Sequence, residues 1–250
     1  MKKQLLSGIA ALVINGFLFG QSTKQELLPA LSVDSFAAKI ERQERPQIID
    51  ARRQEEFIVN HIKDAVNIDQ FAGDYLTQLK QFNQQQPVFI YAIQNYRPGI
   101  LAKELLELGY KEVYILQSGI ASWIGAGHPY YSAMKNIVSL AEYNAVLKAN
   151  KLVLVDIGTK YCGTCVKVKQ VIDSLRQDKD GAFTIEEIDL YHNPELVAGL
   201  KEIHAVPTVL VYKEGKVIWK RTGLSFTKND IETVLSNAKA SIAADIFEGN

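Results

Sequence analysis

The residues best suited to chemistry are Cys162-Gly-Thr-Cys165, which hold the only two cysteines of the 250-residue sequence. They stand where a strand-like run, 152–157, gives way to a helical one. Two thiols this close can form a small disulfide. A thiol at a helix start faces unpaired backbone N–H groups and the positive end of the helix dipole, which favours the nucleophilic thiolate. The spacing therefore indicates thiol–disulfide exchange.

Two other interpretations of the cysteine pair stay open. The pair could be half of a zinc site, which requires two further ligands at suitable spacing. His192 and His204 do not have the usual spacing of a zinc-binding histidine pair, so zinc is disfavoured. A purely structural disulfide is also disfavoured, because a bridge over so short a segment removes almost no loop entropy.

The elements that must position the cysteines alternate between helical and strand-like patterns. Asn193-Pro194 predicts a helix start, with Asn as the cap and Pro at the first position. Glu214-Gly215 lies between two extended runs and predicts a hairpin. The predicted order is α-β-α-β-α-β-β-α, over residues 140–149, 152–157, 162–176, 183–189, 194–203, 208–212, 217–221 and 229–244.

An earlier region, 28–127, shows a similar alternation. The predicted helices are 34–42, 54–60, 74–82 and 98–108, and the predicted strands are 47–51, 65–68, 87–91 and 113–116. Such alternation favours a parallel α/β sheet. Residues 128–134 are predicted to be a linker, and the second region then spans 135–245.

The first 20 residues have the pattern of a secretory signal peptide. Lys2 and Lys3 precede a mostly apolar run from Leu5 to Phe19, and Gly20 offers a small residue for cleavage. The run is short for a membrane span, which needs about 20 apolar residues, although an uncleaved anchor stays open. We expect a periplasmic or secreted protein, in a compartment where a CxxC pair can alternate between dithiol and disulfide.

The composition is that of a globular protein, with 47% hydrophobic and 22% charged residues. The formal net charge is zero, since 28 basic side chains balance 28 acidic ones. This balance, with no long basic run, argues against nucleic acid as a partner.

The second region resembles the thioredoxin family. The resemblance is carried by residues 153–165 (Val-Leu-Val-Asp-Ile-Gly-Thr-Lys-Tyr-Cys-Gly-Thr-Cys), by Val-Pro-Thr at 206–208 and by a later glycine at 223. It implies that Cys162 is the attacking thiolate, exposed at the helix start, and that Cys165 resolves the mixed disulfide. It also implies that Asp156 is a buried acid whose pKa is raised by desolvation, suited to proton exchange with Cys165.

The resemblance also implies a peptide-binding surface around the cysteines. Pro207 is expected to follow a cis peptide bond, and the backbone of Val206 is expected to pair with an extended substrate segment. Tyr161, Gly163 and Thr164 are the remaining substrate-binding candidates.

Several positions depart from the family pattern. Tyr161 stands where tryptophan is common, and Thr164 replaces the proline of the commonest reducing members. The residues between the cysteines tune the redox potential, so Thr164 could shift it towards a better oxidant. Ile185 occupies the place of a lysine that often neighbours the buried acid.

The first region resembles a rhodanese-like domain. The resemblance is carried by the early motifs Ile-Ile-Asp-Ala-Arg (48–52), Glu-Glu-Phe (55–57), His-Ile (61–62) and Ala-Val-Asn-Ile (65–68), and by the late motif at 113–123. Asp50, Arg52 and His61 are interpreted as structural hydrogen-bonding residues.

The catalytic loop of this first region is degenerate. The family's nucleophile is a cysteine directly after the strand at 87–91, and Ala92 stands there instead. An alanine cannot carry a persulfide, so no sulfurtransferase activity is expected from this domain. Arg97, at the end of the loop, is either part of an anion site or a solvated side chain.

These observations predict an α/β protein with a rhodanese-like parallel-sheet domain followed by a thioredoxin-fold domain with a mixed sheet and flanking helices. The predicted function is extracytoplasmic thiol–disulfide exchange with protein substrates and a redox donor or acceptor protein, and the first domain is a binding or positioning module. No metal or organic cofactor is expected beyond the Cys162–Cys165 disulfide. The alternatives are a partner-binding scaffold with a static disulfide, or a sulfur carrier using Cys162.

Overall fold

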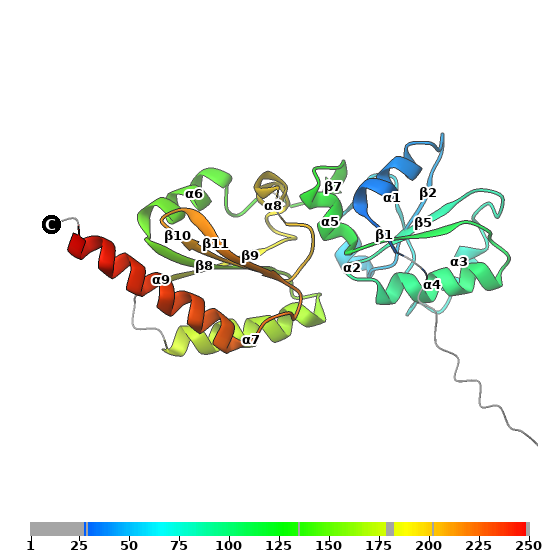
Figure 1. Cartoon of the computed structure of the whole chain (residues 1–250). Helices are drawn as coiled ribbons and strands as arrows, with labels where there is room; N and C mark the ends of the chain where they lie inside the picture. Colours follow the sequence, from blue (N-terminus) through cyan, green and yellow to red (C-terminus); the bar gives the residue numbers. More distant parts are fainter. Residues whose placement is uncertain (1–27, 29, 135, 179–182, 202, 249–250) are drawn as a thin grey trace, which may run out of the picture.

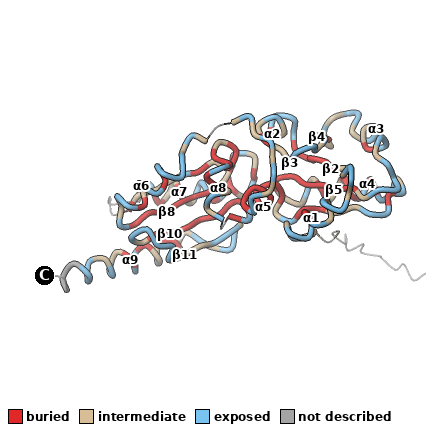
Figure 2. The backbone as a smooth tube through the Cα atoms, turned by 90° about the horizontal axis from the view of Figure 1, so that it is seen from above, coloured by how far each residue is buried: buried red, intermediate tan, exposed pale blue. Residues whose placement is uncertain are grey.

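The computed structural model describes residues 28, 30–134, 136–178, 183–201 and 203–248, which form two α/β domains lying side by side (Figure 1). Buried residues follow the strands of both sheets and continue through helix α5 (Gly119–Gly125), which lies between them (Figure 2). The predicted signal peptide, 1–20, lies outside the described residues.

The first domain contains a parallel sheet with the strand order β1-β6-β5-β2-β4. Its strands are β1 (Ala30–Leu31), β2 (Gln47–Asp50), β4 (Val66–Asn67), β5 (Val88–Tyr91) and β6 (Val113–Leu116). Strand β5 is fully buried, which explains its continuous apolar run. This is the parallel α/β sheet that the sequence predicted.

Helices cover both faces of this sheet. α1 (Val33–Ile40) and α5 pack on one face. α3 (Tyr75–Leu79) and α4 (Tyr96–Glu107) pack on the other. The helix predicted over 54–60 is shorter, because α2 (Gln54–Phe57) gives way to strand β3 (Asn60–Ile62).

The segment predicted as a linker, 128–134, is not free of the first domain. It contains strand β7 (Tyr130–Ser132), which pairs antiparallel with β3. The ring of Tyr131 also stacks on His61 with centroids 4.8 Å apart. The chain therefore leaves the first domain along a strand.

The second domain contains a mixed sheet with the strand order β11-β10-β8-β9. Strands β8 (Leu152–Gly158) and β9 (Thr184–Asp189) are parallel, and β10 (Thr208–Lys213) is antiparallel to β8 and to β11 (Lys216–Thr222). Helices α6 (Leu140–Ala149) and α8 (Pro194–Leu200) cover one face, and α7 (Gly163–Asp178) and α9 (Lys228–Glu248) cover the other. The element order is the predicted one.

Two local predictions can be compared with this structure. Glu214 and Gly215 form the predicted hairpin turn, and both have positive φ angles, of 49° and 75°. Asn193 precedes α8 with Pro194 in the first turn, but its side chain does not cap the helix. Instead, Asn193 Oδ1 accepts a hydrogen bond from the Val138 backbone N–H at 2.7 Å, which fastens the start of the second domain.

Candidate functional site

The two cysteines lie at the carboxyl end of β8, where the chain turns into α7. Cys162 and Cys165 form a disulfide. Cys162 directly precedes α7, and the backbone N–H of Cys165 donates to Cys162 Sγ at 3.2 Å. Thr164 Oγ1 lies 3.1 Å from the same sulfur. These polar neighbours suit a sulfur that carries negative charge after the disulfide is reduced.

Asp156 lies on β8 behind the cysteines and is 8% exposed. Its Oδ1 atom is buried without a hydrogen-bond partner. Burial, assisted by the nearby Glu187 carboxylate, raises the pKa of Asp156 to about 7. Lys169 opposes this shift but is itself bonded to Glu187 at 2.7 Å, so it offsets only part of it. The carboxyl can therefore hold or release a proton near neutral pH.

A cavity of about 340 Å³ connects the acid with the second cysteine. Both Asp156 and Cys165 line it, together with Gly158 and Lys169. A Cβ at Gly158 would lie 3.3 Å from Cys165 Cβ and 3.5 Å from Cys165 Sγ, so a side chain at this position would crowd the second cysteine. The cavity is large enough for water, so a proton can pass between solvent, Asp156 and Cys165.

The segment around Val206 and Pro207 lies beside the cysteines, as the thioredoxin resemblance implied. The Val206–Pro207 peptide bond is cis. Cys162 Sγ lies 3.8 Å from the carbonyl oxygen of Val206. Tyr161 and Thr164 are partly exposed and Gly163 is exposed, whereas Val206 and Pro207 are buried.

The prediction that Cys162 is exposed is wrong for this structure. Its side chain is 0% exposed, whereas Cys165 is 6% exposed. Gln94 of the first domain lies against Cys162: its Nε2 donates to Thr164 Oγ1 at 2.7 Å and lies 3.5 Å from Cys162 Sγ. Gln94 follows Ala92 and Ile93 in the degenerate loop, so the two loops that the resemblances singled out meet each other.

Comparison with known proteins identifies both domains. A family model for the rhodanese-like domain matches residues 32–126, and a model for thioredoxin matches residues 135–237. The thioredoxin of Mycoplasmoides gallisepticum is 32% identical over 102 residues, which cover 41% of this chain and 99% of that protein. The chain belongs to the thioredoxin family. Its thioredoxin domain follows a rhodanese-like domain, as the sequence indicated.

Two further matches concern the thioredoxin domain. The thioredoxin of Chlorobaculum thiosulfatiphilum is 36% identical over 78 residues, which cover 31% of this chain and 71% of that protein. A solved structure of Plasmodium falciparum thioredoxin is 22% identical, covers 42% of this chain and 98% of its own, and has a TM-score of 0.36. Together with the Cys162–Cys165 disulfide, the relatives support thiol–disulfide oxidoreductase activity in general.

The degenerate loop of the rhodanese-like domain is held by its own backbone. Ala92, directly after β5, accepts a hydrogen bond from the Ile120 N–H at 2.8 Å. A Cβ at Gly119 would lie 2.0 Å from the Ala92 carbonyl oxygen, so only glycine allows this approach. Arg97 is bonded to Glu56 at 2.8 Å and is 15% exposed, so it is not a solvated side chain. An anion site at Arg97 stays a prediction.

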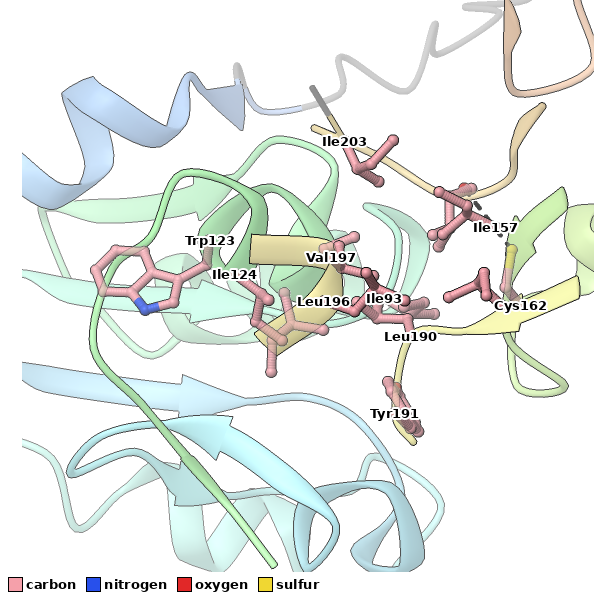
Figure 3. Packing of buried hydrophobic residues seen from close by; sticks show 14 of the residues in the cluster. Ile93, Trp123, Ile124, Ile157, Cys162, Leu190, Tyr191, Leu196, Val197 and Ile203 are labelled. Carbon is pink, nitrogen blue, oxygen red and sulfur yellow. Dashed lines mark hydrogen bonds between the residues drawn. The ribbon is translucent and has the colours of Figure 1, made fainter. Parts of the chain in front are cut away.

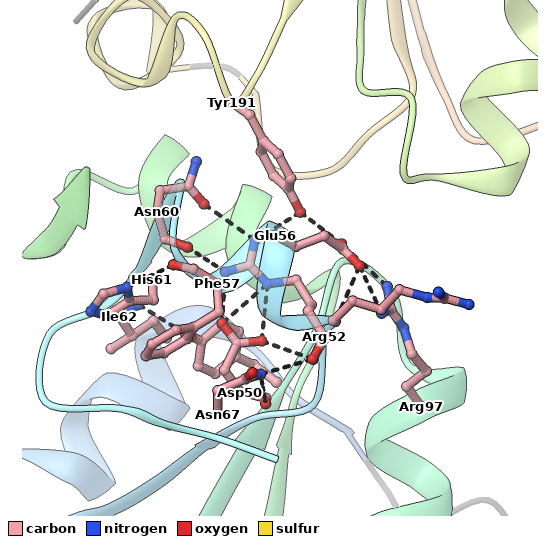
Figure 4. Close-up of polar contacts among 12 residues, drawn as sticks. Asp50, Arg52, Glu56, Phe57, Asn60, His61, Ile62, Asn67, Arg97 and Tyr191 are labelled. Carbon is pink, nitrogen blue, oxygen red and sulfur yellow. Dashed lines mark hydrogen bonds and ion pairs between the residues drawn. The ribbon is translucent and has the colours of Figure 1, made fainter. Parts of the chain in front are cut away.

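A buried polar network joins the two domains (Figure 4). Arg52 and Asp50 form an ion pair at 2.6 Å with both side chains 0% exposed. Arg52 also donates to the Tyr191 hydroxyl of the thioredoxin domain at 2.7 Å, and that hydroxyl donates to Glu56 at 3.0 Å. Burial alone lowers the pKa of Arg52, but Asp50 and its other partners raise it well above its ordinary value, so the guanidinium is charged.

Three residues at this site were not found from the sequence. Lys169 had a local signal, because it lies four residues after Cys165 on the same helix and therefore on the same face. Gln94 and Tyr191 had no local signal, because the groups that each residue contacts belong to the opposite domain. In the described part of the chain, no group of three or more His, Cys, Asp or Glu side chains could hold a metal ion, and no helix is long and apolar enough to cross a membrane.

The buried ion pair leads to a stability prediction. We expect Arg52→Met to lower the free energy of unfolding by about 3–5 kcal/mol, because it leaves the Asp50 carboxylate buried without its partner. Urea unfolding measures this. Lys103→Met is the control, since Lys103 and Glu107 form an ion pair with side chains 69% and 61% exposed, and such pairs contribute at most about 1 kcal/mol. Equal losses in both variants would contradict the assigned network.

Proposed function

We propose that this chain is an extracytoplasmic thiol–disulfide oxidoreductase that exchanges disulfides with protein substrates through Cys162 and Cys165. The observation that carries the proposal is the placement of the CxxC disulfide beside a buried acid and a cis-proline segment, in a domain of the thioredoxin family. The signal-like residues 1–20 support the extracytoplasmic location.

In the reductive direction the proposed chemistry has two steps. The Cys162 thiolate attacks a substrate disulfide, forms a mixed disulfide and releases one substrate thiolate, which takes a proton from solvent. Cys165 gives its proton to Asp156 and attacks the sulfur of Cys162. The second substrate thiolate leaves and the Cys162–Cys165 disulfide closes. A donor dithiol then restores the reduced form, and the reverse sequence oxidises a substrate.

The proposed role of the rhodanese-like domain is positioning or binding, with no sulfur transfer of its own. Ala92 replaces the nucleophile, and its side chain is buried. Val206, Pro207, Tyr161, Gly163 and Thr164 are the proposed substrate-binding residues.

One observation favours the rival function of a non-catalytic scaffold. Cys162 is 0% exposed, as a structural disulfide would be. The two functions differ in redox behaviour, because stable structural disulfides resist mild reductants whereas catalytic ones do not.

The test of the proposed function combines two measurements on the purified chain. We expect it to accelerate the reduction of insulin disulfides by a small dithiol, and its own disulfide to equilibrate with glutathione buffers between roughly −300 and −120 mV, the range of catalytic pairs. A disulfide that stays closed below this range, with no acceleration, would establish the scaffold instead. The measured potential also separates a reductase from an oxidase or isomerase.

A further inference from the structure

The surface around Cys162 is filled by the rhodanese-like domain of the same chain. Cys162 is 0% exposed and Val206 is 5% exposed, although an extended substrate would have to contact both. Ile93 belongs to the same buried apolar cluster as Cys162 (Figure 3). The Gln94 amide binds Thr164 and lies 3.5 Å from the sulfur that must attack. A substrate sulfur cannot reach Cys162 Sγ while this loop is in place.

The interface between the domains also includes helices and a shared buried apolar cluster. One buried cluster continues from Trp123 and Ile124 of α5 to Leu196 and Val197 of α8 (Figure 3). Tyr191 adds polar contacts, since its hydroxyl bonds both Arg52 and Glu56 of the other domain. An apolar interface with buried hydrogen bonds holds two domains in one arrangement.

We propose that loop 92–95 of the rhodanese-like domain, between β5 and α4, is an intramolecular competitor for the protein substrates of Cys162. The inference rests on the proposed function and names what the degenerate domain does for it. The loop lies against Cys162 through Gln94, and Ile93 belongs to the same buried cluster as Val206, so exchange with a protein disulfide requires the two domains to separate. The partner that this surface fits is a protein with an extended segment able to replace the contacts of Ile93 and Gln94.

Gly125 provides a way to weaken the domain contact without touching the site. It lies at the end of α5, and a Cβ placed there would lie 1.7 Å from the backbone oxygen of Ile203 in the thioredoxin domain. That oxygen belongs to the backbone and cannot turn aside, so Gly125→Ala forces the domains apart. Gly99 is the matched control, because it also lies in a helix of the first domain and a Cβ there meets nothing within 4 Å.

The experiment measures how fast Cys162 can be modified. In a Cys165→Ser background, Cys162 is the single thiol of the chain, and its reaction with iodoacetamide is followed by mass spectrometry. Modification of a covered group follows the population of the open form. We expect Gly125→Ala to raise the rate by about tenfold or more, which corresponds to about 1.4 kcal/mol in the opening equilibrium, and Gly99→Ala to leave it unchanged.

A second variant keeps the test valid where Gly125→Ala does not fold, as judged by circular dichroism. Tyr191→Phe removes the hydroxyl that binds Arg52 and Glu56 and keeps the aromatic ring in the cluster. It should also raise the alkylation rate. In chains with both cysteines, the same variants should reduce insulin faster than the parent does.

The outcomes separate the competitor from the proposed function. If Cys162 in the parent reacts as fast as in the urea-unfolded chain, and neither variant changes this, the competitor proposal is overturned, and catalysed insulin reduction can still uphold the proposed function. If alkylation accelerates in the variants while none of them reduces insulin, the loop covers Cys162 and the proposed function fails. Acceleration of both reactions supports both.

Discussion

Cys162→Ser is expected to return insulin reduction to the uncatalysed rate. The sulfur of Cys162 is the atom that bonds the substrate in the proposed sequence, and a serine hydroxyl cannot form a disulfide. Removing a covalent nucleophile is among the largest single-residue effects known in enzymes, so we expect a loss on the order of 10³-fold or more. The measurement is the rate of insulin reduction at a fixed dithiol concentration.

Cys165→Ser is the matched variant, because it removes the other sulfur by the same substitution. It should also lose turnover, but it should accumulate a mixed disulfide between Cys162 and the substrate, visible on a non-reducing gel. Cys162→Ser should form no such adduct. Turnover that survives Cys162→Ser, or an adduct that forms through Cys165, would refute the assigned roles.

The thioredoxin domain was predictable from the sequence because its signals are local. The run 152–157 is apolar except for Asp156, since β8 is covered on both faces by helices. Glu214-Gly215 marks the turn because both residues have positive φ angles. The Cys162–Cys165 spacing identified the site in the same way. Asp156 could be placed next to it only through the family resemblance, since nothing local distinguishes a functional aspartate from a structural one at the end of a strand.

The contact between the domains was not predictable. The exposure of Cys162 depends on Gln94, which is 68 residues away in the sequence. The strand β7 is three residues long and forms only because β3 offers a partner. Nothing in the sequence of α5 indicates why residue 125 is glycine. The structure shows that a side chain there would collide with the backbone of Ile203. Each of these features depends on the packing of segments that are distant in sequence, which no local pattern describes.

Asp156→Asn is expected to stabilise the folded protein, by an amount that depends on pH. The folded protein keeps the carboxyl protonated up to about pH 7, whereas the unfolded chain loses this proton near the ordinary pKa of 3.8. Between these values the unfolded state binds fewer protons, so this group lowers the free energy of unfolding as the pH rises, and the loss is complete above the folded pKa. The shift corresponds to on the order of 4 kcal/mol.

Asp156→Asn should therefore be more stable than the parent at pH 8, by up to about 4 kcal/mol, and equal to it near pH 4. Urea unfolding of the oxidised protein at both pH values measures this difference. A variant that is no more stable at pH 8 than at pH 4, relative to the parent, would show that the carboxyl is not desolvated in the folded state.

The same substitution should slow catalysis although it stabilises the fold. In the proposed sequence the ionised Asp156 takes the proton of Cys165, and loss of a general base typically costs about 10²–10⁴-fold. The rate of the parent should rise with pH through about 7, and Asp156→Asn should lack this rise.

Glu187→Gln should move this rise in rate to lower pH, because the Glu187 carboxylate helps to raise the pKa of Asp156. Glu186→Gln is its control, since neighbouring residues of a strand point to opposite faces of the sheet. If the rise in rate near pH 7 is unchanged in Asp156→Asn, another group accepts the proton of Cys165.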